Sequence, residues 1–296
     1  MVLLDVWHRL GRIIRISNLG IIIFFALNIF LLLKVFFPNG ISWENATLLL
    51  GVYFTMVLIS LSPVGEWILA SLAGAHEIKR KDYKIRLIPL LEVVFNKAKE
   101  RTPDMVNSIR LKIIHDQSPN AFAIGKNTIC VTDGLLNLSD DAIMAVFAHE
   151  VGHLVYKHSV IQLLIGGGNL FISGCLLLIK VMCWTITAIC GLLAIGTRNF
   201  FAGILIALMG SVSSVMIWLW TKFCMLFLMW SIRQNEYVAD EYACKLGFGT
   251  DLAIVLDNVM CSTPENGLLK ALYASHPHSD GRIARLQELG ANYSRY

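Results

Sequence analysis

Charged residues are scarce in this chain. Asp, Glu, Lys and Arg make up 16% of its 296 residues, whereas a soluble domain has about 25%. The deficit lies in two regions dominated by apolar side chains, 13–75 and 160–230. Since about 20 apolar residues cross a bilayer as a helix, each region has room for two spans. This excludes an ordinary soluble protein and predicts spans at 16–37, 46–73, 161–183 and 200–224.

The chain also lacks paired cysteines. None of its seven Cys residues forms a CxxC pair, and four of them lie inside apolar segments. This argues against a disulfide framework or a cysteine-bound metal and indicates small core residues in a reducing compartment. The net charge of +4 is small for this length. It fits contact with anionic lipid headgroups better than binding to nucleic acid, and no nucleic-acid partner is expected.

Lys and Arg are absent from the loop 38–45 between the first two expected spans. They are frequent before the first span (Arg9, Arg12, Arg15) and after the second, at 79–86. Because positively charged loops remain in the cytoplasm, we expect a multi-pass protein with its N-terminus and soluble segments on that side. The first apolar segment is too long for a signal peptide, and residues 1–15 before it are typical of a basic surface helix.

The soluble segments predict an α+β domain in two parts. Between the second and third spans we expect a helix at 87–101, strands at 109–116, 121–124 and 128–132, and a helix capped by Ser139. The expected divisions are an N-terminal helix and membrane hairpin (1–75), a first soluble part (76–159), a second membrane hairpin (160–230) and a second soluble part (231–296).

The soluble helix carries a metal-ligand pattern, HEVGH. His149 and His153 are four residues apart, so both imidazoles leave one face of a helix and can hold one zinc ion at about 2 Å each. Glu150 is rotated by about 100°, where it reaches a water without binding the metal. The simpler alternative is a helix with two structural histidines. His158 lies five residues beyond His153 and is not expected to take part.

A third ligand is available in the second soluble part. Glu236 and Asp240 are also four residues apart, in NEYVAD. Glu236 completes a two-His, one-Glu zinc site, and Asp240 accepts a hydrogen bond from the outer nitrogen of a ligating His. The two expected spans between His153 and Glu236 return the chain to the same side. A solvated acidic helix face is the simpler alternative reading of this pair.

With these residues in view, the chain resembles the HtpX family of membrane-bound zinc endopeptidases, relatives of the CAAX prenyl endopeptidases. The resemblance covers nearly the whole chain and rests on SPNAFAIG (118–125), AHEVGH (148–153), RQNEYVADEYA (233–243) and SHPHSDGRIARL (275–286). It implies a zincin-like protease domain with one Zn²⁺ per chain, in the inner membrane. It further implies a stress-response role, with misfolded membrane proteins and other polypeptides as substrates.

The resemblance also implies roles for residues outside the motif. Asn120, Ala121 and Phe122 would pair with substrate backbone as an added strand, and Asn120 would polarise the scissile carbonyl or simply form a turn before the strand. His276 would stabilise the oxyanion, take the open metal position at rest, or only begin a helix before Pro277. Arg282 would brace the site through a carboxylate.

Two other readings of the sequence remain. An intramembrane protease would place its metal site in the bilayer, but the later spans are nearly free of acids and the motif helix begins with Ser-Asp-Asp. The other reading is a protein that is not an enzyme, either a zinc-stabilised membrane scaffold or a transporter. A transporter would carry more polar residues in its spans than the single Lys180 in the third.

Overall fold

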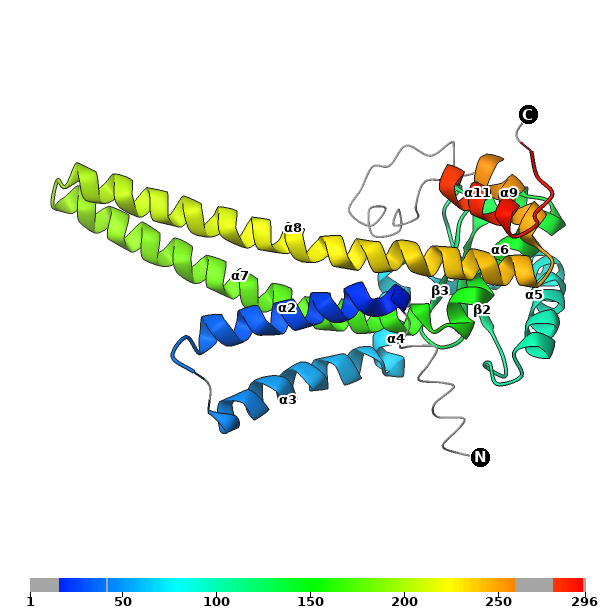
Figure 1. Cartoon of the computed structure of the whole chain (residues 1–296), viewed down its shortest axis with the longest axis horizontal. Coiled ribbons are helices and arrows are strands. Elements are labelled where there is room, and N and C mark those ends of the chain that lie inside the picture. Colours follow the sequence, from blue (N-terminus) through cyan, green and yellow to red (C-terminus); the bar gives the residue numbers. More distant parts are fainter. Residues whose placement is uncertain (1–15, 41, 259–278, 295–296) are drawn as a thin grey trace. The chain divides into compact units, whose positions relative to one another are not determined.

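The computed structural model describes residues 16–40, 42–258 and 279–294. The expected basic helix at 1–15 lies outside these residues. The chain divides into two units: the first contains 58–164 and the segment from 230 onward, and the second contains 20–57 and 165–229. The expected fold class is confirmed: the described residues contain four helices that are long and apolar enough to cross a membrane, and one small sheet (Figure 1).

Two of the four long helices extend well beyond the expected spans. The helices are α2 (Leu19–Phe36), α3 (Trp43–Ser60), α7 (His158–Gly196) and α8 (Phe200–Lys245). At about 1.5 Å per residue, the 46 residues of α8 measure about 70 Å, against a hydrocarbon core of about 30 Å. The C-terminal part of α8 therefore carries Glu236 and Asp240 on the same continuous helix as the fourth span.

The second expected span, 46–73, is two helices rather than one. Helix α3 ends at Ser60, and α4 runs from Pro63 to Leu72. The Ser62 hydroxyl accepts a hydrogen bond from the Val64 N–H, and Pro63 occupies the first turn, where its missing N–H has no cost. The break could not be read from apolar residues alone, because apolar side chains continue on both sides of it.

In the described part of the chain, the sheet has four short strands in the order β1-β2-β4-β3. Strand β1 (His76–Glu77) and β2 (Arg110–Ile114) are antiparallel, β2 and β4 (Thr128–Thr132) are parallel, and β3 (Ala121–Ile124) is antiparallel to β4. The strands expected at 109–116, 121–124 and 128–132 are confirmed to within two residues at each end. Strand β3 is an edge strand: within the described residues its other side pairs with no strand.

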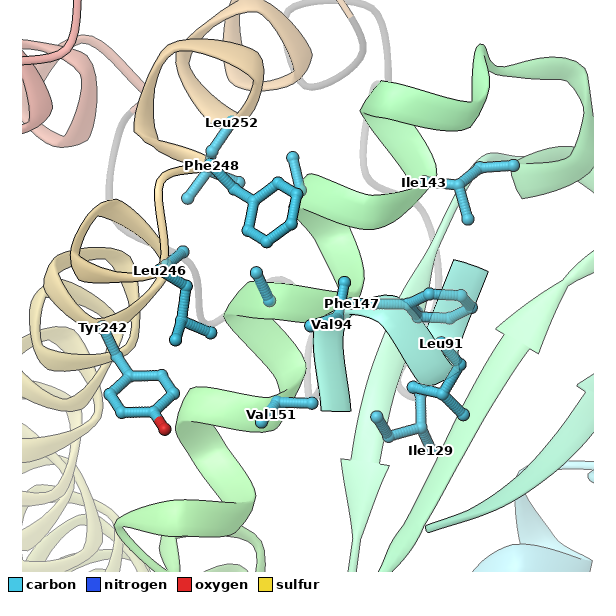
Figure 2. Close-up of a cluster of buried hydrophobic side chains, with 14 of the residues drawn as sticks. Leu91, Val94, Ile129, Ile143, Phe147, Val151, Tyr242, Leu246, Phe248 and Leu252 are labelled. Atoms are coloured by element: carbon cyan, nitrogen blue, oxygen red, sulfur yellow. The ribbon is translucent and has the colours of Figure 1, made fainter. Parts of the chain in front are cut away.

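Helix α6 (Asp140–Val155) is the centre of this unit. On one side Phe147 packs with Ile129 of β4 and Val94 of α5 (Lys81–Arg101) (Figure 2), and on the other Gly152 lies against Tyr242 of α8. Helices α9 (Gly249–Asn258) and α11 (Ser279–Glu288) pack against the same core. Short 3-10 turns occupy Ile16–Asn18 and Asp133–Asn137. The motif helix is buried at every position from Phe147 to Val155.

Candidate metal centre

The start of α6 is set by its sequence. The Ser139 hydroxyl accepts a hydrogen bond from the Ala142 N–H at 3.3 Å, and Asp140 and Asp141 lie at the positive end of the helix. From there an unbroken α-helix reaches Val155. His149 and His153 therefore project from one face, as the spacing predicts, and Glu150 follows about 100° further round.

Gly152 lets α8 approach this helix closely. A Cβ atom at position 152 would lie 3.1 Å from both the Cα and the carbonyl oxygen of Ala239, and 3.3 Å from the Cβ of Tyr242. Any side chain larger than hydrogen would therefore press against α8. The close approach brings Glu236, one turn before Ala239, to the two histidines.

Three ligand atoms converge between α6 and α8. The Nε2 atoms of His149 and His153 are 3.1 Å apart, and the Glu236 carboxylate oxygens lie 3.5 Å from His149 Nε2 and 3.3 Å from His153 Nε2. All three residues are buried, and their ligand atoms lie within 4.8 Å of one another. Within the described residues they form the one group of this kind. The structure thus brings together the three predicted ligands.

These separations fit a tetrahedral zinc ion. Ligand atoms about 2.0–2.1 Å from a tetrahedral metal are about 3.3 Å from one another, and the three observed distances lie between 3.1 and 3.5 Å. Two imidazoles and one carboxylate also match the donor set of catalytic zinc sites, which keep a fourth position open. The three residues therefore fit one zinc ion.

The second nitrogen of His149 is held by Asp240. Its Nδ1 lies 2.8 Å from Asp240 Oδ1, so the Nδ1–H donates to the carboxylate and Nε2 is left for a metal. Arg282 donates to both oxygens of Asp240, through Nε at 2.7 Å and Nη2 at 2.6 Å, and its Nη1 lies 3.3 Å from Glu236. The predicted positions of Asp240 and Arg282 beside the ligands agree with this geometry.

His158 contacts the outer ring nitrogen of His153, as Asp240 does for His149. The sequence did not suggest this contact. Nδ1 of His153 lies 3.0 Å from Nδ1 of His158, which is buried. When His153 binds a metal through Nε2 its Nδ1 carries the proton, so it donates to His158. Helical spacing turns His158 away from the metal face only if the helix continues through it. However, α6 ends at Val155 and Lys157 has φ of 59°, so helical spacing no longer applies.

The excess of buried negative charge favours the binding of a divalent cation. In the described part of the chain, the buried Asp, Glu, Lys and Arg side chains are Glu150, Glu236, Asp240 and Arg282. Three carboxylates and one guanidinium leave two negative charges with neutral histidines, and uncompensated buried charge is costly. A bound Zn²⁺ balances them.

Without a metal, the site favours a proton on His149. Burial lowers the pKa of His149, but its hydrogen bonds to Asp240 and Glu236 outweigh this and raise it to about 10. At neutral pH His149 therefore holds either a proton or a metal ion, since the metal needs the lone pair of Nε2.

A cleft opens beside the ligands. Its volume is about 60 Å³, enough for an ordered water, and Glu150, His149, Arg282, Asn120 and Ala121 line it together with apolar side chains of α6 and α9. Phe122 is not part of this lining. Its side chain packs on the other face of β3, against a small cluster that contains Ala70 of α4. Residue His276 lies outside the described residues.

Comparison with known proteins shows which family the chain belongs to. The sequence pattern of peptidase family M48 matches residues 91–290, about two thirds of the chain. The chain belongs to peptidase family M48. This M48 peptidase is 30% identical over 258 residues to a protease HtpX homolog of Neisseria meningitidis, covering 80% of this chain and 85% of the relative. The HtpX resemblance is confirmed.

Two further matches differ in how much of this chain they cover. A protease HtpX homolog of Caldanaerobacter subterraneus is 26% identical over 210 residues, which are 61% of this chain and 66% of the relative. The crystal structure of S. mikatae Ste24p matches with a TM-score of 0.47 and 18% identity, over 92% of this chain and 63% of Ste24p. The family assignment makes the chain a multi-pass membrane metallopeptidase, a hydrolase of peptide bonds.

Proposed function

We propose that this M48 peptidase is a zinc-dependent endopeptidase of the inner membrane. It hydrolyses peptide bonds of misfolded or damaged membrane proteins at the cytoplasmic face, as part of a stress response. The observation that carries the proposal is the convergence of His149 Nε2, His153 Nε2 and the Glu236 carboxylate within 3.1 to 3.5 Å, beside Glu150 in a cleft. The N-terminus and both soluble parts are assigned to the cytoplasm by their Lys and Arg content.

His149, His153 and Glu236 are the residues that would hold the zinc ion. When bound, zinc supplies Lewis acidity, which lowers the pKa of water toward 7 and polarises a carbonyl. Asp240 holds His149 in the tautomer that leaves Nε2 for the metal. Arg282 fixes Asp240 with two hydrogen bonds and offsets part of the negative charge.

Glu150 is the general base and acid. It follows His149 by one residue on α6, is buried, and lines the cleft without joining the three ligands. In this position its carboxylate takes a proton from the attacking water and later delivers it to the leaving nitrogen of the peptide. On the family resemblance, His276 would stabilise the oxyanion or occupy the open metal position at rest.

Strand β3 would bind substrate through its free edge. The Asn120 carbonyl accepts a hydrogen bond from the Thr132 N–H, so the backbone groups of Asn120 point toward β4. Because these groups alternate along an antiparallel strand, those of Phe122 also point toward β4, whereas those of Ala121 and Ala123 face the free edge. We therefore place substrate pairing at Ala121 and Ala123, with Asn120 acting through its side chain in the cleft. Backbone pairing tolerates many substrate sequences.

The experiment uses the full chain purified in detergent, with a destabilised membrane protein as substrate. Cleavage should stop when a chelator removes the metal and return when Zn²⁺ is added. If the zinc-loaded chain does not cleave, it is a scaffold or transporter instead. A fluorescent reporter that matures only in the cytoplasm, fused to the C-terminus, tests the orientation. A dark reporter on a well-expressed chain would contradict the cytoplasmic assignment.

A further inference from the structure

Helix α4 is apolar on the face that it exposes. Its outward stripe consists of Val64, Trp67, Ile68 and Leu72, which are 44–68% exposed. These positions follow the i, i+3, i+4, i+8 spacing of a single helix face. Between them lies Ser71, also exposed. Large apolar side chains gathered on one exposed face indicate that something apolar covers it.

The opposite face of α4 packs on the strand that we assign to substrate binding. Ala70 is buried in a small cluster with Ile124 of β3 and Cys130 of β4, against which Phe122 also packs. Helix α6, with the metal ligands, contacts β3 as well. The side chains of Ala121 and Ala123 belong to the core that contains α6, whereas those of Phe122 and Ile124 lie with α4. Strand β3 therefore has α6 on one face and α4 on the other.

Glu66 links α4 to the turn after β3. Its Oε1 accepts a hydrogen bond from the Lys126 N–H at 2.9 Å, and its Oε2 lies 3.4 Å from Nη2 of Arg110. Gly125 has φ of 60°, and a Cβ atom there would lie 2.2 Å from the Glu66 carboxylate. The Gly125 carbonyl accepts a hydrogen bond from the Ser159 hydroxyl at 2.6 Å. The turn is thus held by α4 on one side and by the start of α7 on the other.

Lipid is the partner whose chemistry matches the exposed apolar stripe of α4. Only two residues separate α4 from α3, a candidate membrane span, so the position of α4 along the chain is at a membrane boundary. Trp67 is of the residue type enriched at that boundary. The basic segment 79–86 follows α4 within seven residues and complements anionic headgroups.

We propose that α4 lies in the headgroup boundary of the bilayer with Val64, Trp67, Ile68 and Leu72 toward the acyl chains, and that Glu66 on its other side positions the substrate strand. The second half rests on the proposed function, because it takes β3 as the substrate strand. Glu66 acts through the turn and is a positioning residue. Lipid contact then orders β3, so that substrate binds more tightly when the protein is in a bilayer than in detergent.

Photocrosslinking of the full chain tests the lipid contact without any assay of activity. Benzoylphenylalanine replaces Trp67, and in a second protein Val93, an exposed apolar residue of α5. Both proteins are irradiated in nanodiscs of phosphatidylethanolamine and phosphatidylglycerol. Lipid adducts are expected at position 67 and in much lower yield at 93. Adducts to protein at 67, or equal lipid yields at both positions, would overturn the lipid assignment.

Hydrogen exchange and kinetics test the role of Glu66. Glu66→Ala should speed exchange of the Lys126 amide by about tenfold, the low end of what a hydrogen bond to a charged group contributes. It should also raise KM for a polypeptide about tenfold while kcat and zinc content stay unchanged. Glu66→Gln keeps the acceptor and should restore KM to within about twofold. Unchanged exchange and KM in Glu66→Ala would refute the link. If the wild-type protein does not cleave at all, the exchange of the Lys126 amide still shows whether Glu66 holds the turn after β3.

Discussion

Replacing Asp240 with Asn removes one negative charge and changes almost no volume. The Nδ1–H of His149 keeps an oxygen within reach, but the acceptor is now neutral and the bidentate ion pair with Arg282 is lost. Once residue 240 is neutral, the ion pair that Arg282 keeps is the one with Glu236, whose carboxylate lies 3.3 Å from Nη1 of Arg282. The variant therefore weakens the hold on His149 and draws Glu236 away from the metal.

The expected loss of zinc affinity is 10- to 100-fold, the usual effect of changing the outer partner of a ligating histidine. This corresponds to about 1.4 to 2.7 kcal/mol. The dissociation constant is measured by competition with a chromophoric zinc chelator at constant pH, in the same detergent for every variant.

Glu241→Gln is the matched control. Glu241 is the next residue of α8, and the substitution removes the same charge, but its carboxylate pairs with Lys245 on the exposed side of the helix. Exposed pairs of this kind contribute little, so zinc affinity should stay within about twofold of wild type. An Asp240→Asn protein that binds zinc as tightly as Glu241→Gln would refute our account of the site.

Four further predictions rest on the same contacts. Zinc binding at pH 7.5 should release about one proton, from His149, measured by calorimetry in two buffers of different ionisation enthalpy; release of none would contradict the raised pKa. In the metal-free protein, protonated His149 contributes fully to the free energy of unfolding below about pH 6.5, and this contribution is lost as the pH rises toward 10. Denaturation of the chelated protein at pH 6 and at pH 9 measures the difference. His158→Ala should lower zinc affinity about tenfold by freeing the ring of His153; an affinity equal to wild type would show that the contact is incidental. Gly152→Ala should reduce zinc content by pushing Ala239, and with it Glu236, outward; full occupancy in metal analysis would show that α8 accommodates the methyl group.

The metal ligands were predictable because each pair lies on one continuous helix. His149 and His153 on α6, and Glu236 and Asp240 on α8, are four residues apart, and helical geometry alone puts each pair on one face. That the two pairs meet depended on a second argument, an even number of membrane crossings between them. The strands around 121–124 and 128–132 were predictable from their apolar pattern and the Gly-Lys-Asn turn.

The remaining features depend on contacts between segments distant in sequence or on local breaks. His158 joins His153 because α6 stops and the chain turns at Lys157, which a helical projection cannot anticipate. Helix α4 separates from α3 at a capped proline inside an apolar run. The edges of β3 became distinguishable only once the contact between Asn120 and Thr132 established which backbone groups face β4.

The central claim is that Glu150 moves protons beside a zinc ion held by His149, His153 and Glu236. Glu150→Gln keeps the volume of the side chain and leaves the three ligands untouched. The most direct test measures zinc content and cleavage of an unfolded membrane protein on the same detergent-purified samples of wild type and this variant. Our account predicts equal zinc content, with cleavage by the variant reduced at least about a hundredfold. A variant that holds zinc and cleaves at the wild-type rate would contradict it.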